Sequence, residues 1–156
     1  MAIEKIIETE SSLSFDDLVK RYISEPLQLS SLRVAHGIFD EDLDGYEAGW
    51  VWHGLVMANA ADVARFMNSE KVSRLNTALN RVTYQDDYWK DPHYGLGLMV
   101  EPGVMYGHLG GGPGYEAACI KFLNKGISIC AIVESSQGES ALARVFREKD
   151  IFLSGQ

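Results

Sequence analysis

The chain has 156 residues, 46% of them hydrophobic, and a formal net charge of −8 at pH 7. This length and composition predict one folded domain with a single hydrophobic core. The acidic balance argues against nucleic acid and anionic membranes as partners, because no basic stripe is present to neutralise phosphates. No apolar run reaches the length of a membrane span, and the charged N-terminus does not resemble a signal peptide, so the sequence as given indicates a cytoplasmic protein.

A helix is predicted near the start of the chain. Ser14 can cap a helix that begins at Phe15, and Asp17 occupies its third position. Pro26 is expected to end this helix. An irregular connection follows over residues 31–53.

Two further helices are predicted from caps and apolar spacing. The second begins after Asn59, which can cap it together with Asp62, and its apolar residues are Ala60, Val63, Ala64 and Met67. The third has apolar residues at spacings of three and four, namely Val72, Leu75, Leu79 and Val82. Residues 84–93 are polar and aromatic, and they are predicted to form a loop.

The second half of the chain changes to the pattern of strands. We predict strands over residues 94–100, 104–109, 115–123 and 127–134. A turn over residues 124–126 joins the last two strands, whose nearly continuous apolar character indicates a sheet covered on both faces. Leu142, Val145 and Phe146 mark a closing helix. Helices followed by an antiparallel sheet and a C-terminal helix define an α+β fold.

The most informative segment is Tyr106-Gly107-His108-Leu109-Gly110-Gly111-Gly112-Pro113-Gly114-Tyr115, which holds five glycines and one histidine. Such a density of glycine indicates a sharp bend, or a backbone that another group approaches closely. A histidine at the end of a glycine-rich strand is well placed to meet that group. The alternative is that the glycines only form a tight junction between two strands and that His108 has a structural role.

This block resembles the third active-site motif, Lys/His-x-Gly, of the serine β-lactamase and penicillin-binding-protein family. It is most similar to the class C β-lactamase, esterase and D-aminopeptidase branch. Residues 15–29, 54–66 and 94–98 are similar to other segments of that family and occur in the same order, although Gln28 stands where the family has glycine. The resemblance implies a β-lactamase/transpeptidase-like fold, of which residues 1–156 would form the C-terminal half-domain.

Two catalytic motifs of the family do not occur in this sequence. The family's nucleophile lies in Ser-x-x-Lys and its second motif is Tyr-x-Asn. No lysine here has a serine three residues before it, and no tyrosine has an asparagine two residues after it. Residues 1–8 resemble the helix that follows Tyr-x-Asn in the family. We therefore expect the C-terminal portion of a hydrolase domain that is inactive alone.

The resemblance also implies roles within the glycine-rich block. His108 takes the place of the motif's lysine or histidine, and the N–H of Gly111 becomes the donor to the developing oxyanion, so these are the expected catalytic residues. Leu109 stands where penicillin-recognising members have threonine or serine, which favours an esterase or a peptidase. The positions expected to meet the substrate are Tyr106, Leu109, Gly110, Gly112 and Tyr115.

Two acidic segments are predicted to be solvated loops. Residues 40–45 resemble the opening of an EF-hand, but Val51 replaces the bidentate glutamate that such a loop needs. A weak calcium site in this loop is the alternative. Four residues further along have metal-binding side chains without the spacing of a metal motif: Asp86, Asp87, Asp91 and His93. No metal site is expected.

Two aromatic segments, one serine and the two cysteines are not expected to take part in catalysis. The aromatic segments 50–53 and 87–90 can border a cleft, but partial burial in the core is the favoured interpretation. Ser140 is expected to open the closing helix and not to act as a nucleophile. Cys119 and Cys130 lie in apolar strands, so buried free thiols are expected in place of a disulfide.

Two functions from different classes follow. The first is part of a serine hydrolase that acts on a small ester, amide or peptide and needs no cofactor; its longer parent chain can still be exported. The second is a truncated or degenerate relative that binds a ligand or partner without catalysis. In the family that this sequence resembles, the strand equivalent to residues 127–133 pairs on one side with an N-terminal strand that is not present here. The resemblance therefore implies a free apolar edge, without proline or charge, which predicts a homodimer or association with the missing N-terminal half.

Overall fold

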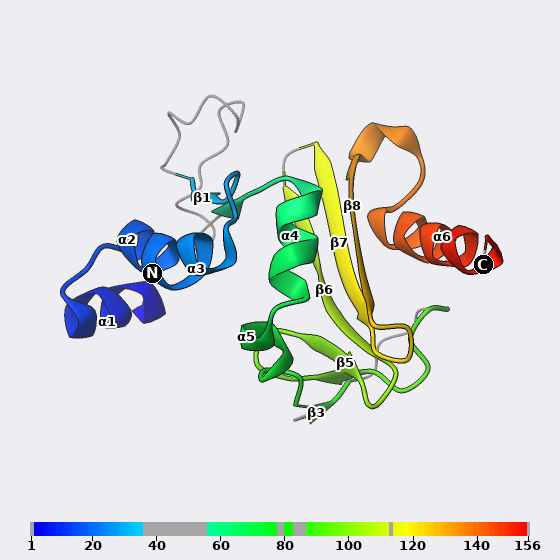
Figure 1. The fold of residues 1–156 in the computed structure, drawn as a ribbon, viewed down its shortest axis with the longest axis horizontal. Helices are drawn as coiled ribbons and strands as arrows, with labels where there is room; N and C mark the ends of the chain where they lie inside the picture. Colours follow the sequence, from blue (N-terminus) through cyan, green and yellow to red (C-terminus); the bar gives the residue numbers. More distant parts are fainter. Residues whose placement is uncertain (1, 36–55, 78–79, 83–86, 113, 156) are drawn as a thin grey trace. The chain divides into compact units, whose positions relative to one another are not determined.

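A computed structural model describes residues 2–35, 56–77, 80–82, 87–112 and 114–155 of the chain (Figure 1). The chain divides into two compact units, Met1–Asp62 and Val63–Gln156. The first is mainly helical, and the second holds a six-stranded antiparallel sheet. In the part of the chain that is described, no helix is long and apolar enough to cross a membrane.

The first unit holds short helices, a π-helical turn and a two-stranded ribbon: α1 (Ala2–Ser11), α2 (Phe15–Val19), η1 (Lys20–Ser24), α3 (Glu25–Leu27), β1 (Arg33–Val34) and β2 (Val56–Met57). The predicted cap is confirmed, because Ser14 Oγ accepts a hydrogen bond from the Asp17 N–H at 3.1 Å. The prediction that Pro26 ends the helix is wrong. The proline falls in the first turn of α3, where its missing N–H costs little. The helical segment ends at Gln28, whose φ of 54° is left-handed.

The cap of the next helix, α4 (Ala60–Met67), is also confirmed. Asn59 Oδ1 accepts a hydrogen bond from the Asp62 N–H at 2.8 Å. The buried carboxylate of Asp62 accepts two more, from the N–H and the hydroxyl of Ser31, both at 2.7 Å. Asp62 therefore ties the chain before β1 to the start of α4 within the first unit.

The second unit is built on one sheet whose strands follow the chain order β3 (Asn80–Arg81), β4 (His93–Tyr94), β5 (Met99–Glu101), β6 (Met105–Gly112), β7 (Tyr115–Phe122) and β8 (Ile127–Glu134). All neighbours are antiparallel. A short helix, α5 (Glu70–Ser73), follows α4, and a 3₁₀ turn, η5 (Ser135–Gln137), leads to α6 (Ala141–Ser154). Ser140 Oγ caps α6 by accepting from the Ala143 N–H at 3.2 Å, as predicted.

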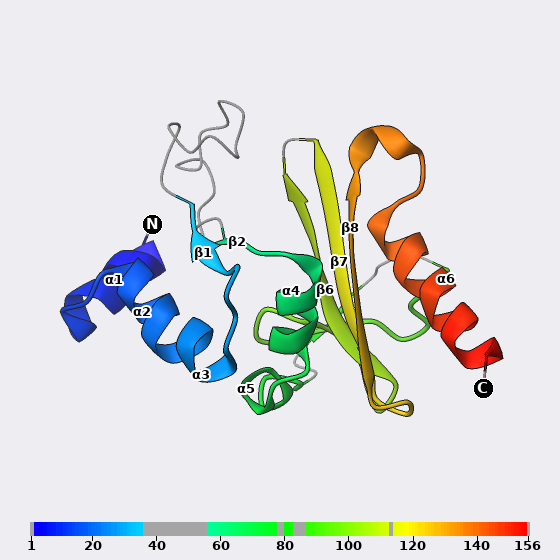
Figure 2. The ribbon, with the colours of Figure 1, turned by 45° about the horizontal axis from the view of Figure 1, so that its top comes forward.

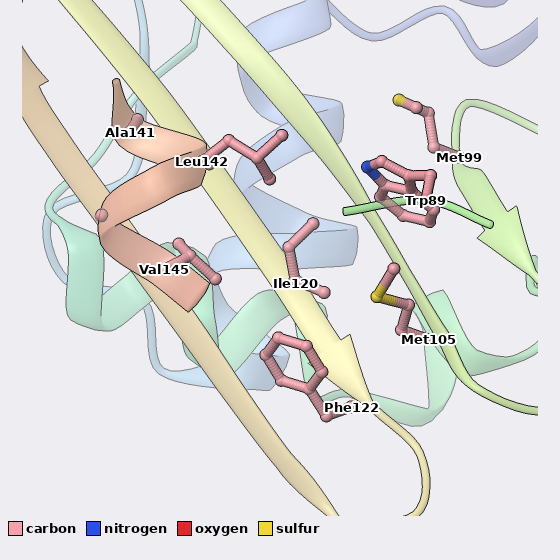
Figure 3. Packing of buried hydrophobic residues seen from close by; sticks show 10 residues of the cluster. Trp89, Met99, Met105, Ile120, Phe122, Ala141, Leu142 and Val145 are labelled. Atoms are coloured by element: carbon pink, nitrogen blue, oxygen red, sulfur yellow. The ribbon is translucent and has the colours of Figure 1, made fainter. Parts of the chain in front are cut away.

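Helices cover both faces of this sheet, as the apolar strands predict. Figure 2 shows α4 on one side of β6–β8 and α6 on the other. Alternate residues of β7 belong to two separate core clusters. Ile120 and Phe122 face α6, where Figure 3 shows them beside Leu142 and Val145. Cys119 faces the opposite cluster, which contains residues of α4 and α5.

The third predicted helix is only partly correct. The helix α5 stops at Ser73, and Asn80–Arg81 form the edge strand β3 in place of a continuing helix. Val72 is buried, but Leu75 is 38% exposed, so the two residues do not share one buried face. The pairing of β3 with β4 is a long-range interaction that local apolar spacing does not reveal.

The single strand predicted over residues 94–100 is a hairpin. Tyr94 pairs with Met99, and the Gly95 N–H donates to Leu98 C=O at 2.8 Å across the turn. Gly97 has φ of 72°, which glycine adopts without strain. The glycines of this segment therefore reverse the chain, and β4 and β5 replace the predicted single strand.

The two cysteines face each other on neighbouring strands. Cys119 of β7 lies directly opposite Cys130 of β8. Both are free, as predicted, and Cys119 is buried while Cys130 is half-buried. The Cys119 thiol donates to Val63 C=O at 3.8 Å. The interaction between the two neighbouring thiols lowers the pKa of Cys130, and the same interaction together with burial raises the pKa of Cys119. Cys130 is therefore the thiol that ionises first.

We predict that iodoacetamide modifies Cys130 before Cys119, because the thiolate is the reactive form. The rate should begin to rise at a lower pH than for an ordinary thiol, because the pKa of Cys130 is lowered. Peptide mass spectrometry after short exposures across a pH series measures both positions.

The matched control is Cys119→Ser. A serine hydroxyl is a different donor, so the onset of Cys130 labelling should move in pH if the Cys119 thiol sets it. Faster labelling of Cys119 than of Cys130 in the unsubstituted chain would contradict the assignment.

Candidate active site

The strand β6 is covered unequally on its two sides. It pairs with β7 along its full length, from Met105 to Gly112. It pairs with β5 only over Met105–Gly107. From His108 onward, no strand in the described sheet lies on the β5 side of β6.

The direction of the backbone groups along β6 follows from one hydrogen bond. Leu123 N–H donates to Val104 C=O at 2.9 Å, which makes this pair a hydrogen-bonded one. Hydrogen-bonded pairs alternate along an antiparallel ladder, so even-numbered residues of β6 direct their N–H and C=O groups toward β7. The N–H groups of Leu109 and Gly111 therefore point to the uncovered side, where a ligand can accept from them.

The imidazole of His108 lies at the start of this uncovered stretch and is exposed. Its Nδ1 contacts the carbonyl oxygen of Leu109, and its Nε2 lies 2.8 Å from the hydroxyl oxygen of Tyr94. A carbonyl can only accept, so Nδ1 carries the proton. In the neutral imidazole, Nε2 is then the acceptor and the Tyr94 hydroxyl is the donor.

The glycines of the block have different structural causes. A Cβ at Gly107 would lie 2.2 Å from the carbonyl oxygen of Cys119, so packing requires glycine there. Gly114 has φ of 77°, which the turn requires. A Cβ at Gly110 would make only an ordinary contact, at 3.6 Å from Ala117 Cβ, and one at Gly111 or Gly112 would meet nothing within 4 Å. The fold explains Gly107 and Gly114, tolerates a side chain at Gly110, and leaves open space beside Gly111 and Gly112.

A sequence model of the family described as Beta-lactamase matches residues 2–151 of the chain. The chain belongs to the β-lactamase family. No match was found among curated proteins.

Two solved structures share the fold of this β-lactamase-family chain. The octameric penicillin-binding protein homologue from Pyrococcus abyssi aligns with a TM-score of 0.71 at 18% identity, over 97% of this chain and 40% of that chain. The D-stereospecific amidohydrolase from Streptomyces sp. aligns with a TM-score of 0.62 at 17% identity, over 84% of this chain and 47% of that chain. The predicted β-lactamase/transpeptidase-like fold is confirmed, and the chain spans less than half the length of either protein.

The expected site residues of this family member do not all lie on the open stretch of β6. Tyr106 is 1% exposed, and its hydroxyl donates to Met67 C=O at 3.4 Å, so its side chain belongs to the core. Leu109 packs against the core cluster on the α6 face. His108, Gly110, Gly111 and Gly112 are exposed along the strand, and Tyr115 is 53% exposed opposite Gly112.

One neighbour of the site was missed from sequence. Tyr94 contacts His108 from fourteen positions earlier in the chain, and the two rings meet edge-on with centroids 6.0 Å apart. The sequence identifies Tyr94 only as the first residue of segment 94–98, which is similar to a segment of the family. The signal that could have identified it is the turn over residues 95–98, which brings the end of β4 next to β5 and thus close to β6.

The aromatic residues of segment 87–90 belong to the core and not to this site. Trp89 is buried in the core, and Tyr88 stacks on Phe146 with ring centroids 4.4 Å apart, in agreement with the favoured interpretation. Residues 40–45, 50–53 and Asp86 lie outside the described residues. Among the residues that are described, no group of three metal-binding side chains is found.

Proposed function

We propose that this chain supplies the His-x-Gly wall of the active site of a β-lactamase-like serine hydrolase. The observation that carries the proposal is the Gly111 N–H, which points to the uncovered side of β6 beside the exposed His108. A fixed backbone donor of this kind stabilises the oxyanion of an acyl-transfer transition state by about 3 kcal/mol. The open space beside Gly111 and Gly112 leaves room for the substrate.

The nucleophile of the proposed reaction comes from residues outside this chain, because no Ser-x-x-Lys occurs in its sequence. A serine would attack the substrate carbonyl and form an acyl-enzyme, which water would then hydrolyse. The proposed substrate class is a small ester, amide or peptide. Leu109 brings no hydroxyl for a substrate carboxylate and packs into the core, which supports an esterase or a peptidase over a β-lactamase.

The test is to express the chain with and without the coding sequence that precedes it. We expect the 156-residue chain to hydrolyse a chromogenic ester or cephalosporin no faster than buffer. We expect a longer product with Ser-x-x-Lys and Tyr-x-Asn to be active and to be labelled on one serine by a fluorophosphonate. Serine labelling of the short chain would contradict its inactivity. A long product without these motifs and without labelling would favour the alternative, a non-catalytic binding module.

We further propose that the chain associates with a second copy through the edge of β8. This strand is the last in the described sheet and pairs only with β7. Its residues from Ile127 to Val133 include no proline and no charge, and Ile132 is 40% exposed. Unprotected edges of this kind recruit another strand. The penicillin-binding protein homologue with the same fold is an octamer, which agrees with a tendency to assemble.

The predicted dimer should be seen by light scattering at micromolar concentration. Ile132→Lys places a charge at the edge and should give a monomer. Ile151→Lys changes an exposed residue of α6 and should leave the dimer intact. A monomeric unsubstituted chain would contradict the proposal, and dissociation by Ile151→Lys alone would assign the interface to α6.

A further inference from the structure

We infer that Tyr94 is a positioning residue that holds the imidazole of His108 in one orientation within the proposed site. The inference rests on the proposed function for its catalytic meaning. Its structural content, a hydroxyl that donates to Nε2 of the imidazole, can be measured without any activity.

Both ring nitrogens of His108 have partners. Nδ1 donates to the Leu109 carbonyl on the uncovered side of β6, and Nε2 accepts from the Tyr94 hydroxyl at 2.8 Å. These two bonds fix the plane of the ring, and the Leu109 carbonyl, which can only accept, selects the Nδ1–H tautomer. The neutral imidazole therefore offers no free N–H to a substrate. His108 instead affects the site by holding the Tyr94 hydroxyl and the Leu109 carbonyl in place, and by the positive charge that it carries when protonated.

The backbone of Tyr94 is held in place by its neighbours. Its backbone lies between two strands, because Tyr94 pairs with Asn80 of β3 and with Met99 of β5. The next residue is held closely, since a Cβ at Gly95 would lie 2.3 Å from Thr77 C=O. A phenol fixed in this way can hold its partner in place, which a side chain on a loose loop does less well.

The Tyr94 hydroxyl also suits both charge states of His108. It donates to Nε2 while the imidazole is neutral, and it can turn to accept when Nε2 carries a proton. The pair thus retains its hydrogen bond when His108 gains or loses a proton. The imidazole keeps its position through a change of charge, as a group that adjusts the protonation of a nearby serine and lysine must do.

The first experiment is nitrogen-15 NMR of the imidazoles in the labelled chain, at a pH where His108 is neutral. We expect the Nδ1–H tautomer for His108, with its signals assigned by their loss in His108→Gln, and an Nε2 signal typical of a nitrogen that accepts a hydrogen bond. Tyr94→Phe keeps the ring and removes the donor, so the Nε2 signal should shift while Nδ1 stays protonated by its bond to the Leu109 carbonyl. Tyr22→Phe, which changes another exposed tyrosine, should leave the Nε2 signal unchanged. An unchanged Nε2 signal in Tyr94→Phe would overturn the inference.

The second experiment uses the longer, catalytically complete protein. Tyr94→Phe should lower kcat by about fivefold, as expected for one lost hydrogen bond. In a His108→Ala background the same substitution should have no further effect, because Tyr94 acts through His108. An equal loss in both backgrounds would overturn the inference. If the longer protein has no activity, the proposed function fails while the NMR result still decides the role of Tyr94.

Discussion

Replacing Gly107 with alanine is expected to destabilise the second unit by at least about 3 kcal/mol, the upper range for overpacking in a core. The new Cβ would lie 2.2 Å from the Cys119 carbonyl oxygen and 2.6 Å from Ile120 Cδ1. The side chain can rotate away, but the carbonyl belongs to β7, which is paired on both sides with β6 and β8. Relief therefore requires part of the central ladder to separate. Urea unfolding followed by circular dichroism measures the change.

The matched control for Gly107 is Gly112→Ala on the same strand. A Cβ at Gly112 meets nothing within 4 Å, and its φ is not in the left-handed region, so the free energy of unfolding should change by less than about 0.5 kcal/mol. Similar unfolding midpoints for the two variants would show that β6 and β7 are not packed as described.

The second large effect is expected at Gly111, in the catalytically complete protein. Gly111→Pro removes the N–H that faces the uncovered side of β6 and should lower kcat by about 10²- to 10³-fold, as for the loss of an oxyanion donor. The sheet should survive, because proline is tolerated where the N–H of an edge does not join the ladder.

The comparison for Gly111→Pro is Gly111→Ala, which keeps the N–H and places its Cβ in open space. The alanine variant should retain much more activity than the proline variant, at equal stability by urea unfolding. Equal activity of the two variants would remove the Gly111 N–H from the mechanism. A proline variant that unfolds more readily would instead show that this N–H belongs to the ladder.

Local chemistry accounts for much of what the sequence predicted correctly. Ser14, Asn59 and Ser140 each cap a helix with their own side chains, within three residues of the bonded N–H. Such contacts depend on short spacing and are therefore readable from sequence. The sequence also predicts β7 and β8 correctly, because their long apolar runs indicate strands that are buried on both faces of a sheet.

The errors arose where distant residues decide the structure. Leu75 follows helical spacing, but the pairing of β3 with β4 ends the helical pattern that it suggested. Residues 94–100 look like one strand until Gly97 reverses the chain. The contact between Tyr94 and His108 exists only because that hairpin lies beside β6. Tyr106 and His108 share one face of β6, so the alternation of faces predicts no difference between them. Tyr106 is buried because Met67 and Val72 pack against it, which is again a contact between distant residues.

The early end of β5 has a consequence for how ligands and partners can bind to the sheet. Because β5 stops opposite Gly107, the described sheet has unpaired backbone N–H and C=O groups along the end of β6, in addition to those of its edge strands β3 and β8. The groups of β6 and those of β8 face opposite directions, and β7 lies between the two strands, so about 10 Å of sheet separates them. A ligand on β6 and a second copy on β8 would therefore not compete. A compound that binds along the end of β6 should bind monomer and dimer with the same affinity. A peptide that pairs with the edge of β8 should leave the end of β6 accessible.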